Sequence, residues 1–251
     1  MSPAEALLVL AAGAGAGAAN ALAGGGTLLA FPALLAVGLP PVQANTTCSV
    51  GLLGGYAGGS VAYRAELTGQ GSRARGLLVA SVLGGLAGAV LLLATPGDGF
   101  RVVVPYLVLL ACGLLAVQPR LAKALTLRGV AGPHPGWEAQ LAVGLAAVYG
   151  SYFGAGLGVV LLAVLGVLVP DGLQRLNALK GVLSLVVNLV GATIFVVTGH
   201  VDALAAVLLA VGAFVGGTAG VRLARRLPPE AVRAGVVAVG VVVAIVLLVR
   251  R

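Results

Sequence analysis

The stretch "NALAGGGTLLAFPALLAVGLPPVQAN", residues 20–45, interrupts an apolar segment with the residues that form helices least well. Three consecutive glycines at 24–26 follow Asn20, and a Pro-Pro pair lies at 40–41. In a helix interior, glycine and proline cost about 1 and 3 kcal/mol relative to alanine. Non-helical backbone at membrane depth is tolerated only where it is buried in protein or lines a wet cavity. The stretch therefore predicts a broken membrane helix with a functional purpose.

The composition indicates that the bilayer is the main solvent of this chain. Of its 251 residues 60% are hydrophobic and 9% are charged, with a mean hydropathy of +1.12, whereas soluble domains carry about 25% charged residues. We expect an all-α, polytopic membrane protein. Its apolar segments are predicted at 4–19, 27–39, 42–63, 76–95, 101–118, 137–150, 156–169, 176–198, 203–221 and 231–249.

The net charge of +8 is concentrated in loops rather than on one face. The basic residues of three loops are Arg64, Arg73 and Arg75; Arg120, Lys123 and Arg128; and Arg222, Arg225, Arg226 and Arg233. The intervening loops "TPGDGFR" and "TGHVD" contain a single basic residue, Arg101. Because basic loops stay in the cytoplasm, membrane topology explains the charge and argues against a nucleic-acid partner.

Counting the segments from the basic loops predicts an inverted repeat. A segment shorter than about 20 residues does not readily span a bilayer, so the short segments are read as hairpins that return to their starting side. The first repeat, 1–118, holds a broken hairpin at 4–39 and spans at 42–63, 76–95 and 101–118. A cytoplasmic linker covers 119–136. The second repeat, 137–251, holds a hairpin at 137–169 and spans at 176–198, 203–221 and 231–249.

Each half is then a hairpin plus three spans, so the halves have opposite orientations and both termini are external. Arg250 and Arg251 would lie outside, against the basic-loop rule. The halves also share a pattern, because "GGGTLLAFPALLAVGLP" from Gly24 aligns with "GAGLGVVLLAVLGVLVP" from Gly154. Inverted repeats with glycine-interrupted segments are typical of secondary transporters, whose substrate lies near the membrane midplane.

At these residues the sequence resembles the sulfite and sulfonate exporters of the TauE/SafE (TSUP) family. The resemblance rests on "NALAGGGTLLAFPALLAVGLPPVQANTTCSV" and on "YGSYFGAGLGVVLLAVLGVLVPDGLQRLNALKGVLSLVVN". It implies transport of small sulfur oxyanions or organosulfur anions across the cytoplasmic membrane, mostly outward. The second motif departs from a triple glycine, since Ala155 stands in its centre.

A broken helix presents free backbone N–H groups and a positive dipole end, which together suit an anion. Hydroxyl and amide side chains nearby could donate further hydrogen bonds, although gluing helices together is their competing role. The candidate substrate-binding residues are Asn20, Gly24, Gly25, Gly26, Thr27, Asn45, Thr46, Thr47, Ser151, Tyr152, Gly154, Gly156, Asn177 and Lys180.

Lys180 is the sharpest candidate, since a lysine inside a membrane segment is expensive and usually functional. It follows Asn177 at i, i+3 spacing, which places both on one helix face. The alternative is that its ammonium snorkels to the cytoplasmic interface beside Arg175.

The sequence predicts no enzyme, cofactor or metal site, because no carboxylate or histidine falls in the middle of an apolar segment. The leading hypothesis is an alternating-access exporter in the cytoplasmic membrane, and no titratable group for proton coupling is found. Two alternatives remain: an uptake permease of the same fold for thiosulfate or another small anion, and a non-transporting scaffold or sensor. The expected partners are a small anion, the lipid bilayer and, as an open alternative, a second copy of the chain.

Overall fold

The structure is a computed structural model that describes the chain except residues 23, 126–135, 170, 224–228 and 250–251. The regular elements of the described part are all α-helices, as the composition predicts. They are α1 Pro3–Leu22, α2 Thr27–Ala36, α3 Pro41–Ala62, α4 Gly71–Ala94, α5 Gly97–Leu125, α6 Trp137–Tyr152, α7 Leu157–Leu168, α8 Leu173–Val197, α9 Ala203–Leu223 and α10 Pro229–Val249.

Five helices in the described ranges, α1, α4, α5, α8 and α9, are long and apolar enough to cross a membrane. The prediction of an all-α, polytopic membrane protein is therefore confirmed. Helix α3 has the length of a span, but it carries the polar run from Asn45 to Ser49, whose side chains are all buried. Its low hydropathy reflects a central position among other helices rather than contact with water.

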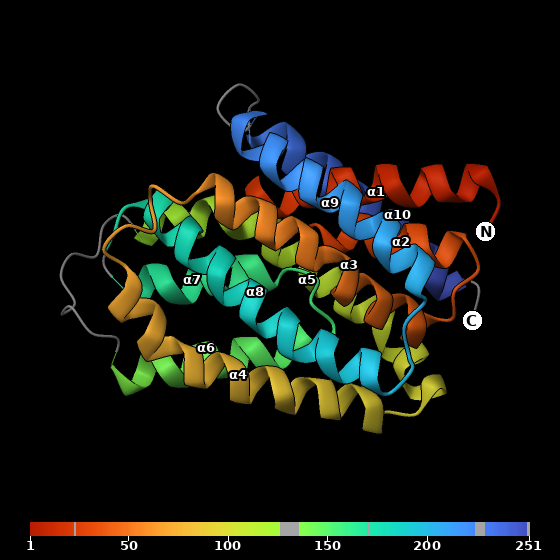
Figure 1. Cartoon of the computed structure of the whole chain (residues 1–251), viewed down its shortest axis with the longest axis horizontal. Coiled ribbons are helices and arrows are strands. Elements are labelled where there is room, and N and C mark those ends of the chain that lie inside the picture. The colour runs from red at the N-terminus through yellow and green to blue at the C-terminus, as the bar shows by residue number, and fades with distance from the viewer. Residues whose placement is uncertain (23, 126–135, 170, 224–228, 250–251) are drawn as a thin grey trace.

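The two short helices each form a hairpin with the helix before them (Figure 1). Helix α2 has 10 residues and turns back from the end of α1, while α7 has 12 residues and turns back from α6. The sequence breaks occur where the glycines predict them, between Leu22 and Thr27 and between Tyr152 and Leu157. At about 1.5 Å per residue, neither short helix could span a bilayer alone.

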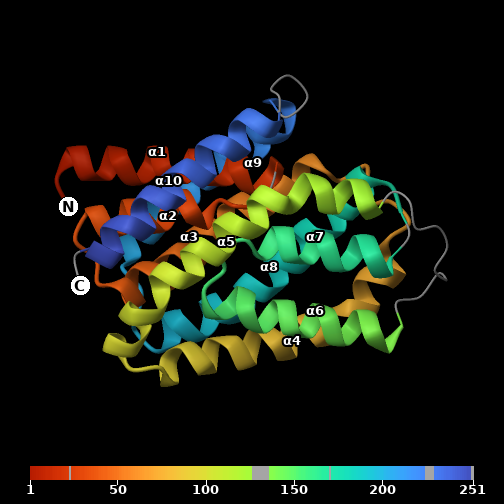
Figure 2. The same cartoon turned by 180° about the vertical axis from the view of Figure 1, so that it is seen from behind.

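The two predicted halves interlock rather than forming separate lobes (Figures 1 and 2). Helix α1 packs on α9 of the other half, and α6 packs correspondingly on α4. Helices α3 and α8 contact each other, as do α5 and α10. If each helix of the first half is matched with the helix five places later, so that α1 matches α6 and α4 matches α9, the contact of α1 with α9 corresponds to that of α6 with α4. The contacts of α3 with α8 and of α5 with α10 correspond to themselves. An inverted repeat predicts this correspondence, and the repeat itself stays a prediction.

Small residues allow close packing of the helix pairs that join the two halves, α1 with α9 and α4 with α6. A Cβ on Gly17 of α1 would clash with the backbone of Ala213 in α9, and one on Gly216 of α9 would clash with Ala14. Between α4 and α6, a Cβ on Gly88 would meet the backbone of Val148. Such close approach of backbones is how helices pack where lipid supplies no hydrophobic driving force.

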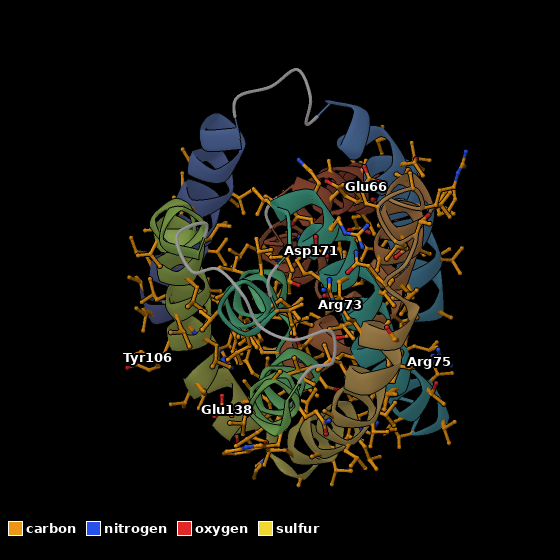
Figure 3. The ribbon with its side chains drawn as sticks, turned by 90° about the vertical axis from the view of Figure 1, so that its left-hand side faces the viewer. Glu66, Arg73, Arg75, Tyr106, Glu138 and Asp171 are labelled. Atoms are coloured by element: carbon orange, nitrogen blue, oxygen red, sulfur yellow. The ribbon has the colours of Figure 1, made fainter. Side chains whose placement is uncertain are left out.

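Both chain termini lie at one end of the bundle (Figure 1). Glu66, Arg73, Arg75 and Asp171 lie at the opposite end (Figure 3). This end carries the first basic loop, so we refer to it as the basic end.

Two predictions about the segments differ from the structure. The segment at 4–19, predicted to be too short to span, is helix α1 with 20 residues and is long enough to cross a membrane. The second difference is the end of α5. Helix α5 continues to Leu125, so the start of the linker predicted over 119–136 is helical. The run "LAKAL" consists of strong helix formers, which let the helix extend past the bilayer-length segment. The remainder of the linker up to 135, and Arg250 and Arg251, lie outside the described residues.

Candidate functional site

The two glycine breaks meet in the middle of the bundle. Gly24 and Gly154, which align with each other in the two motifs, both have a positive φ, 85° and 78°. Glycine adopts this backbone conformation readily. A Cβ on Gly24 would lie 2.7 Å from the Cα of Gly158, in the first turn of α7. A Cβ on Gly154 would lie 3.7 Å from the hydroxyl oxygen of Thr27, the first residue of α2. Each break therefore contacts the short helix of the other hairpin.

Asn20 closes the first break. Its side-chain oxygen accepts a hydrogen bond from the Gly26 N–H at 2.8 Å, so one free backbone donor at the start of α2 is satisfied. The amide nitrogen of the same side chain is buried and has no hydrogen-bond partner in the described part of the protein. A buried donor without a partner costs about 1–3 kcal/mol. Asn20 thus presents one unused donor beside the break.

Lys180 links both breaks through one side chain. Its stem lies against Gly158, where an added Cβ would sit 3.5 Å from the Lys180 Cδ. Its ammonium donates to the Asn177 side-chain oxygen at 3.0 Å and to the Asn20 backbone carbonyl at 3.5 Å. The side chain is 3% exposed. The ammonium is therefore buried among neutral oxygens and does not extend along the helix toward Arg175.

Among the described residues the ion pairs all involve Asp171, so Lys180 has no carboxylate partner there. A buried cation without a counter-charge is expensive in a membrane. Its position near the carbonyl end of α1 recovers part of this cost, because that end carries the negative pole of the helix dipole.

A small cavity adjoins the ammonium. It has a volume of about 20 Å³, enough for one water molecule. The residues that line it come from α1, α3 and α8, and they include Asn20, Asn177 and Lys180. Tyr63, just past the end of α3, also lines it, so the cavity extends toward the basic end.

Helix α3 and its C-cap residue supply three further polar side chains to the cavity, none of them among the residues predicted from sequence. Tyr56, Ser60 and Tyr63 recur at i, i+4 and i+7, so they share one face, and all three line the cavity. The Ser60 hydroxyl is buried without a hydrogen-bond partner within the described ranges. The Tyr56 hydroxyl lies beside the amide side chains of Asn188 and Asn20. The spacing of these hydroxyls along one helix face is the sequence signal that could have identified them as neighbours.

Asn45, Thr46 and Thr47 do not line this cavity. The Asn45 side chain donates to the Tyr152 carbonyl at 2.9 Å and so caps the end of α6. The Thr46 hydroxyl donates to the His200 carbonyl, and the Thr47 hydroxyl accepts from the Asp202 N–H at 3.0 Å. These threonines attach α3 to the loop between α8 and α9.

The remaining predicted residues lie farther around the breaks. A Cβ on Gly25 would meet Leu115 and Val236, and one on Gly156 would meet Ala111, so both glycines face α5. The Ser151 hydroxyl is buried against Gly191 of α8. The Tyr152 ring packs edge-on against Phe100, with ring centroids 5.9 Å apart. The structure therefore brings together Asn20, Gly24, Gly26, Asn177 and Lys180.

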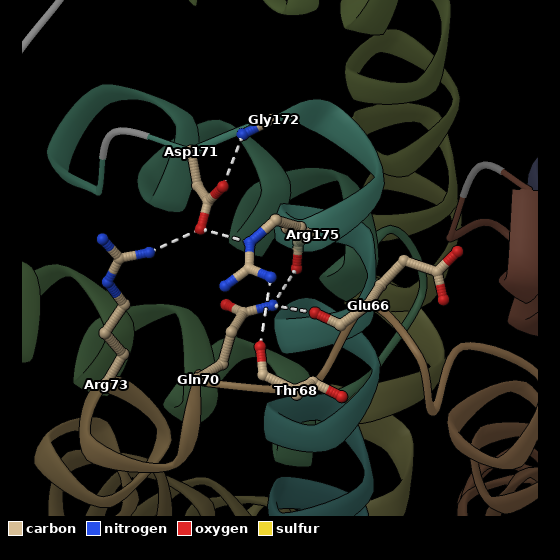
Figure 4. Close-up of polar contacts among 7 residues, drawn as sticks. All are labelled: Glu66, Thr68, Gln70, Arg73, Asp171, Gly172 and Arg175. Carbon is tan, nitrogen blue, oxygen red and sulfur yellow. Dashed lines mark hydrogen bonds and ion pairs between the residues drawn. The ribbon is translucent and has the colours of Figure 1, made fainter.

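An ionic network joins the two halves at the basic end (Figure 4). The Asp171 carboxylate receives hydrogen bonds from Arg73 at 2.5 Å and from Arg175 at 2.9 Å. Gln70 donates to the carbonyls of Glu66 and Arg175, and Arg175 donates to the Thr68 carbonyl. The network holds the loop after α3 against the start of α8.

Opposing effects act on the pKa of Asp171. Burial raises it, but hydrogen bonds from Arg175 and the Gly172 N–H, the Arg175 charge and the Arg73 hydrogen bond lower it more. The net result is a pKa below the ordinary value for aspartate, so the carboxylate is ionised at neutral pH. Within the part of the chain that the structure describes, no cluster of three or more metal-ligating side chains occurs.

Comparison with known proteins connects this geometry to a family. The profile described as "Sulfite exporter TauE/SafE" matches residues 9–247. The chain is 26% identical over 230 residues to the probable membrane transporter protein YfcA of Escherichia coli K12, covering 91% of this chain and 84% of that protein.

A second relative is the probable membrane transporter protein ORF9 of a Sinorhizobium species. It is 27% identical over 231 residues, covering 91% of this chain and 87% of that protein. No solved structure matches the chain. Because the profile spans nearly the whole length, including both broken hairpins, the chain belongs to the TauE/SafE family of membrane transporters.

Proposed function

We propose that this transporter exports a small sulfur-containing anion, such as sulfite or a sulfonate, across the cytoplasmic membrane by alternating access. The binding site is the cavity at Lys180. The proposal contains no enzymatic step: the protein binds the anion on one side and releases it on the other. The sulfur chemistry is taken from the family profile that the chain matches.

The observation that carries the proposal is the buried ammonium of Lys180 with only the neutral oxygens of Asn177 and Asn20 around it. An anion in the cavity would supply the missing counter-charge. Oxyanion oxygens would also accept hydrogen bonds from the two unused donors on the same walls, the Asn20 amide and the Ser60 hydroxyl. Charge-assisted hydrogen bonds of this kind are roughly twice as strong as neutral ones.

The cavity volume of about 20 Å³ leaves no room for an anion larger than water. Its walls must therefore separate during transport. The geometry supports a rearrangement at the contact between the two hairpins, because Lys180 touches both breaks and each break abuts the other hairpin. Transporters with inverted repeats alternate access by moving one repeat unit against the other around such a site.

Outward movement of an anion is favourable without a coupling ion. In a cell that is negative inside, each negative charge leaving gains about 2.3 kcal/mol per 100 mV. The cavity extends toward the basic end, which the basic-loop rule assigns to the cytoplasm. Both features support capture from inside.

The first test measures anion affinity on purified protein. Sulfite, sulfate, thiosulfate, taurine and sulfoacetate are titrated against the parent protein, Lys180→Met and Asn20→Ala. We expect at least one anion to bind the parent and to bind Lys180→Met at least about tenfold more weakly, the equivalent of one lost charge-assisted hydrogen bond. Arg64→Gln is the control, since Arg64 is an exposed basic residue that does not line the cavity.

Unchanged affinity in Lys180→Met would remove this residue from the site. Binding of none of these anions would favour the scaffold or sensor alternative. Direction is tested separately in proteoliposomes that carry an inside-negative potential: uptake against that potential would identify a permease rather than an exporter.

A further inference from the structure

A larger crevice lies at the end of the bundle that carries the termini, and it shares no lining residue with the Lys180 cavity. It has a volume of about 580 Å³ and is enclosed by α2, α5 and α10. This lies within the roughly 300–1,000 Å³ typical of sites for small organic ligands. Its walls are apolar, and they include Phe31, Leu35, Val104, Val243 and Leu247.

The rim of the crevice is continuous with an apolar outer surface. Val246 lines the crevice and is 42% exposed, and Val242 and Ile245 beside it on α10 are also exposed. On α5, Val102 and Val103 are exposed next to the crevice. In a protein that crosses a membrane, such side chains face the hydrocarbon of the bilayer. The crevice is thus accessible to lipid.

Arg101 provides the charge at this rim. It lies in the second turn of α5, its side chain is exposed, and it lines the crevice. Asp98 precedes it by three residues, yet the ion pairs among the described residues involve only Asp171, so Arg101 has no acidic partner there. An arginine surrounded by valines at a bilayer surface is suited to a phosphate group, which it can bind through two parallel hydrogen bonds.

We propose that this crevice binds an anionic phospholipid, with the phosphate on Arg101 and one acyl chain along the partly exposed side chains of Leu35, Val243 and Leu247. Charge complementarity selects the head group, and the apolar walls accommodate the chain. The membrane around the protein supplies this ligand, so the proposal does not depend on the identity of the transported anion.

The transported anion is a less suitable occupant. Phe31, at the base of the crevice, stacks edge-on against Phe153 with ring centroids 5.6 Å apart, and Phe153 packs in the same way on Phe100. All three rings are at most 1% exposed. They separate the crevice from Gly154 and the second break. A small hydrophilic anion would also leave most of the apolar wall without a partner.

The bound chain would press on α2, the short helix that begins at the first break. Helix α2 contains Pro32 next to Phe31, and both line the crevice. The lipid would therefore fill the space behind the first hairpin and support α2 in the arrangement that the structure shows.

The test uses quenching by phospholipids with brominated acyl chains. The chain contains one tryptophan, Trp137, the first residue of α6, so Trp137→Phe provides a background without fluorescence from tryptophan. Leu35→Trp then places a reporter in the crevice, and Leu83→Trp places one on the exposed surface of α4. Brominated phosphatidylglycerol is compared with brominated phosphatidylcholine in detergent micelles.

We expect phosphatidylglycerol to quench the Leu35→Trp reporter at lower lipid fractions than phosphatidylcholine, and the Leu83→Trp reporter to show no preference. Adding Arg101→Gln should weaken the preference for the anionic lipid about five-fold, whereas Arg64→Gln should leave it unchanged. Equal quenching by both lipids at Leu35→Trp, or a preference of the same size in Arg101→Gln as in the parent, overturns the proposal. Displacement of the lipid by millimolar sulfite or sulfoacetate would instead assign the crevice to the transport path.

Discussion

Gly24 and Gly158 approach so closely that neither position has room for a side chain. A Cβ on either residue would lie 2.7 Å from the Cα of the other, a distance that real Cβ contacts essentially never show. The two residues belong to different hairpins and to opposite halves of the chain. This backbone contact holds the two breaks together and so fixes the position of Lys180, whose stem lies on Gly158.

Gly158→Ala isolates that contact from any effect on φ, because Gly158 lies inside α7, whereas Gly24 has a φ of 85°. We expect the overpacked variant to lose about 1–3 kcal/mol of stability. It should also lose anion binding, because the start of α7 that is displaced lies against the stem of Lys180 on α8. Thermal unfolding in detergent and anion titration measure both effects.

Gly113→Ala is the matched control. Gly113 lies in α5 and an added Cβ would meet nothing within 4 Å, so this variant should match the parent or gain up to about 1 kcal/mol from helix propensity. Parent-like stability and binding in Gly158→Ala would show that the contact between the hairpins is not required.

Lys180→Met should leave the stability of the anion-free protein unchanged or raise it. Replacing a buried, uncompensated charge with an apolar side chain of similar length removes its desolvation cost. The parent should gain about 2.7 kcal/mol at an anion concentration of 100 times its Kd, while the variant, which binds at least about tenfold more weakly, should gain about 1.4 kcal/mol or less. If Lys180 serves only to cap α1 at the Asn20 carbonyl, the variant would be less stable without anion, which is the contrary outcome.

Asp171→Asn should loosen the network at the basic end. Because the folded state lowers the pKa of Asp171, the carboxylate stabilises the protein above its ordinary pKa of about 3.8. That contribution disappears as the pH falls through the lower folded value. We expect the parent to exceed the variant by about 1 kcal/mol or less at pH 7, since the pairs are partly exposed.

Melting temperatures recorded from pH 7 down to pH 3 check this expectation. The curves of the parent and Asp171→Asn should converge at the acid end of the series. A difference that is the same at every pH would mean that the aspartate acts through shape rather than charge.

Gly216→Ala should weaken the contact between α1 and α9. The added methyl group would overlap the backbone of Ala14, and a helix pair in lipid has no hydrophobic force to offset the separation. We expect reduced yield of folded protein in detergent, measured by size-exclusion chromatography. Gly235→Ala in α10 is its control, because an added Cβ there meets nothing within 4 Å.

Topology can be tested with single cysteines, since Cys48 and Cys112 are both buried. Ser2→Cys at the N-terminus should react with a membrane-impermeant reagent in intact cells. Ala65→Cys, in the loop after α3, should react only after permeabilisation. The opposite pattern would reverse the assignment of the basic end to the cytoplasm.

Local backbone chemistry made the breaks predictable from sequence. The glycines at 24–26 and at 154 and 156 cannot continue an apolar helix cheaply, so the local sequence predicted a break after α1 and after α6. It placed the two helix ends at 19 and 150, slightly before the observed ends at Leu22 and Tyr152. Of the two hydrogen-bond partners of Lys180, only one could be predicted from the sequence. Its pairing with Asn177 follows from helical spacing, but its bond to Asn20 joins positions 160 residues apart, and no local pattern encodes that distance.

The roles of Thr46 and Thr47 could not be read from sequence for a related reason. Their proximity to the first break along the chain suggested a ligand site, yet α3 carries their hydroxyls toward the loop after α8. A hydroxyl in an apolar helix signals only that a partner exists. Whether that partner is a ligand or a backbone carbonyl depends on which helices become neighbours.

The exchange of partners between the halves has a consequence for biogenesis. Helix α1 leaves the ribosome well before α9, the helix on which it packs and which begins at Ala203. At about 5–20 residues per second, roughly 180 residues of synthesis separate the two, a delay on the order of ten to forty seconds. During that time the glycine face of α1 has no partner, so the nascent first hairpin must wait in the bilayer, or beside the insertion machinery, until its other half arrives.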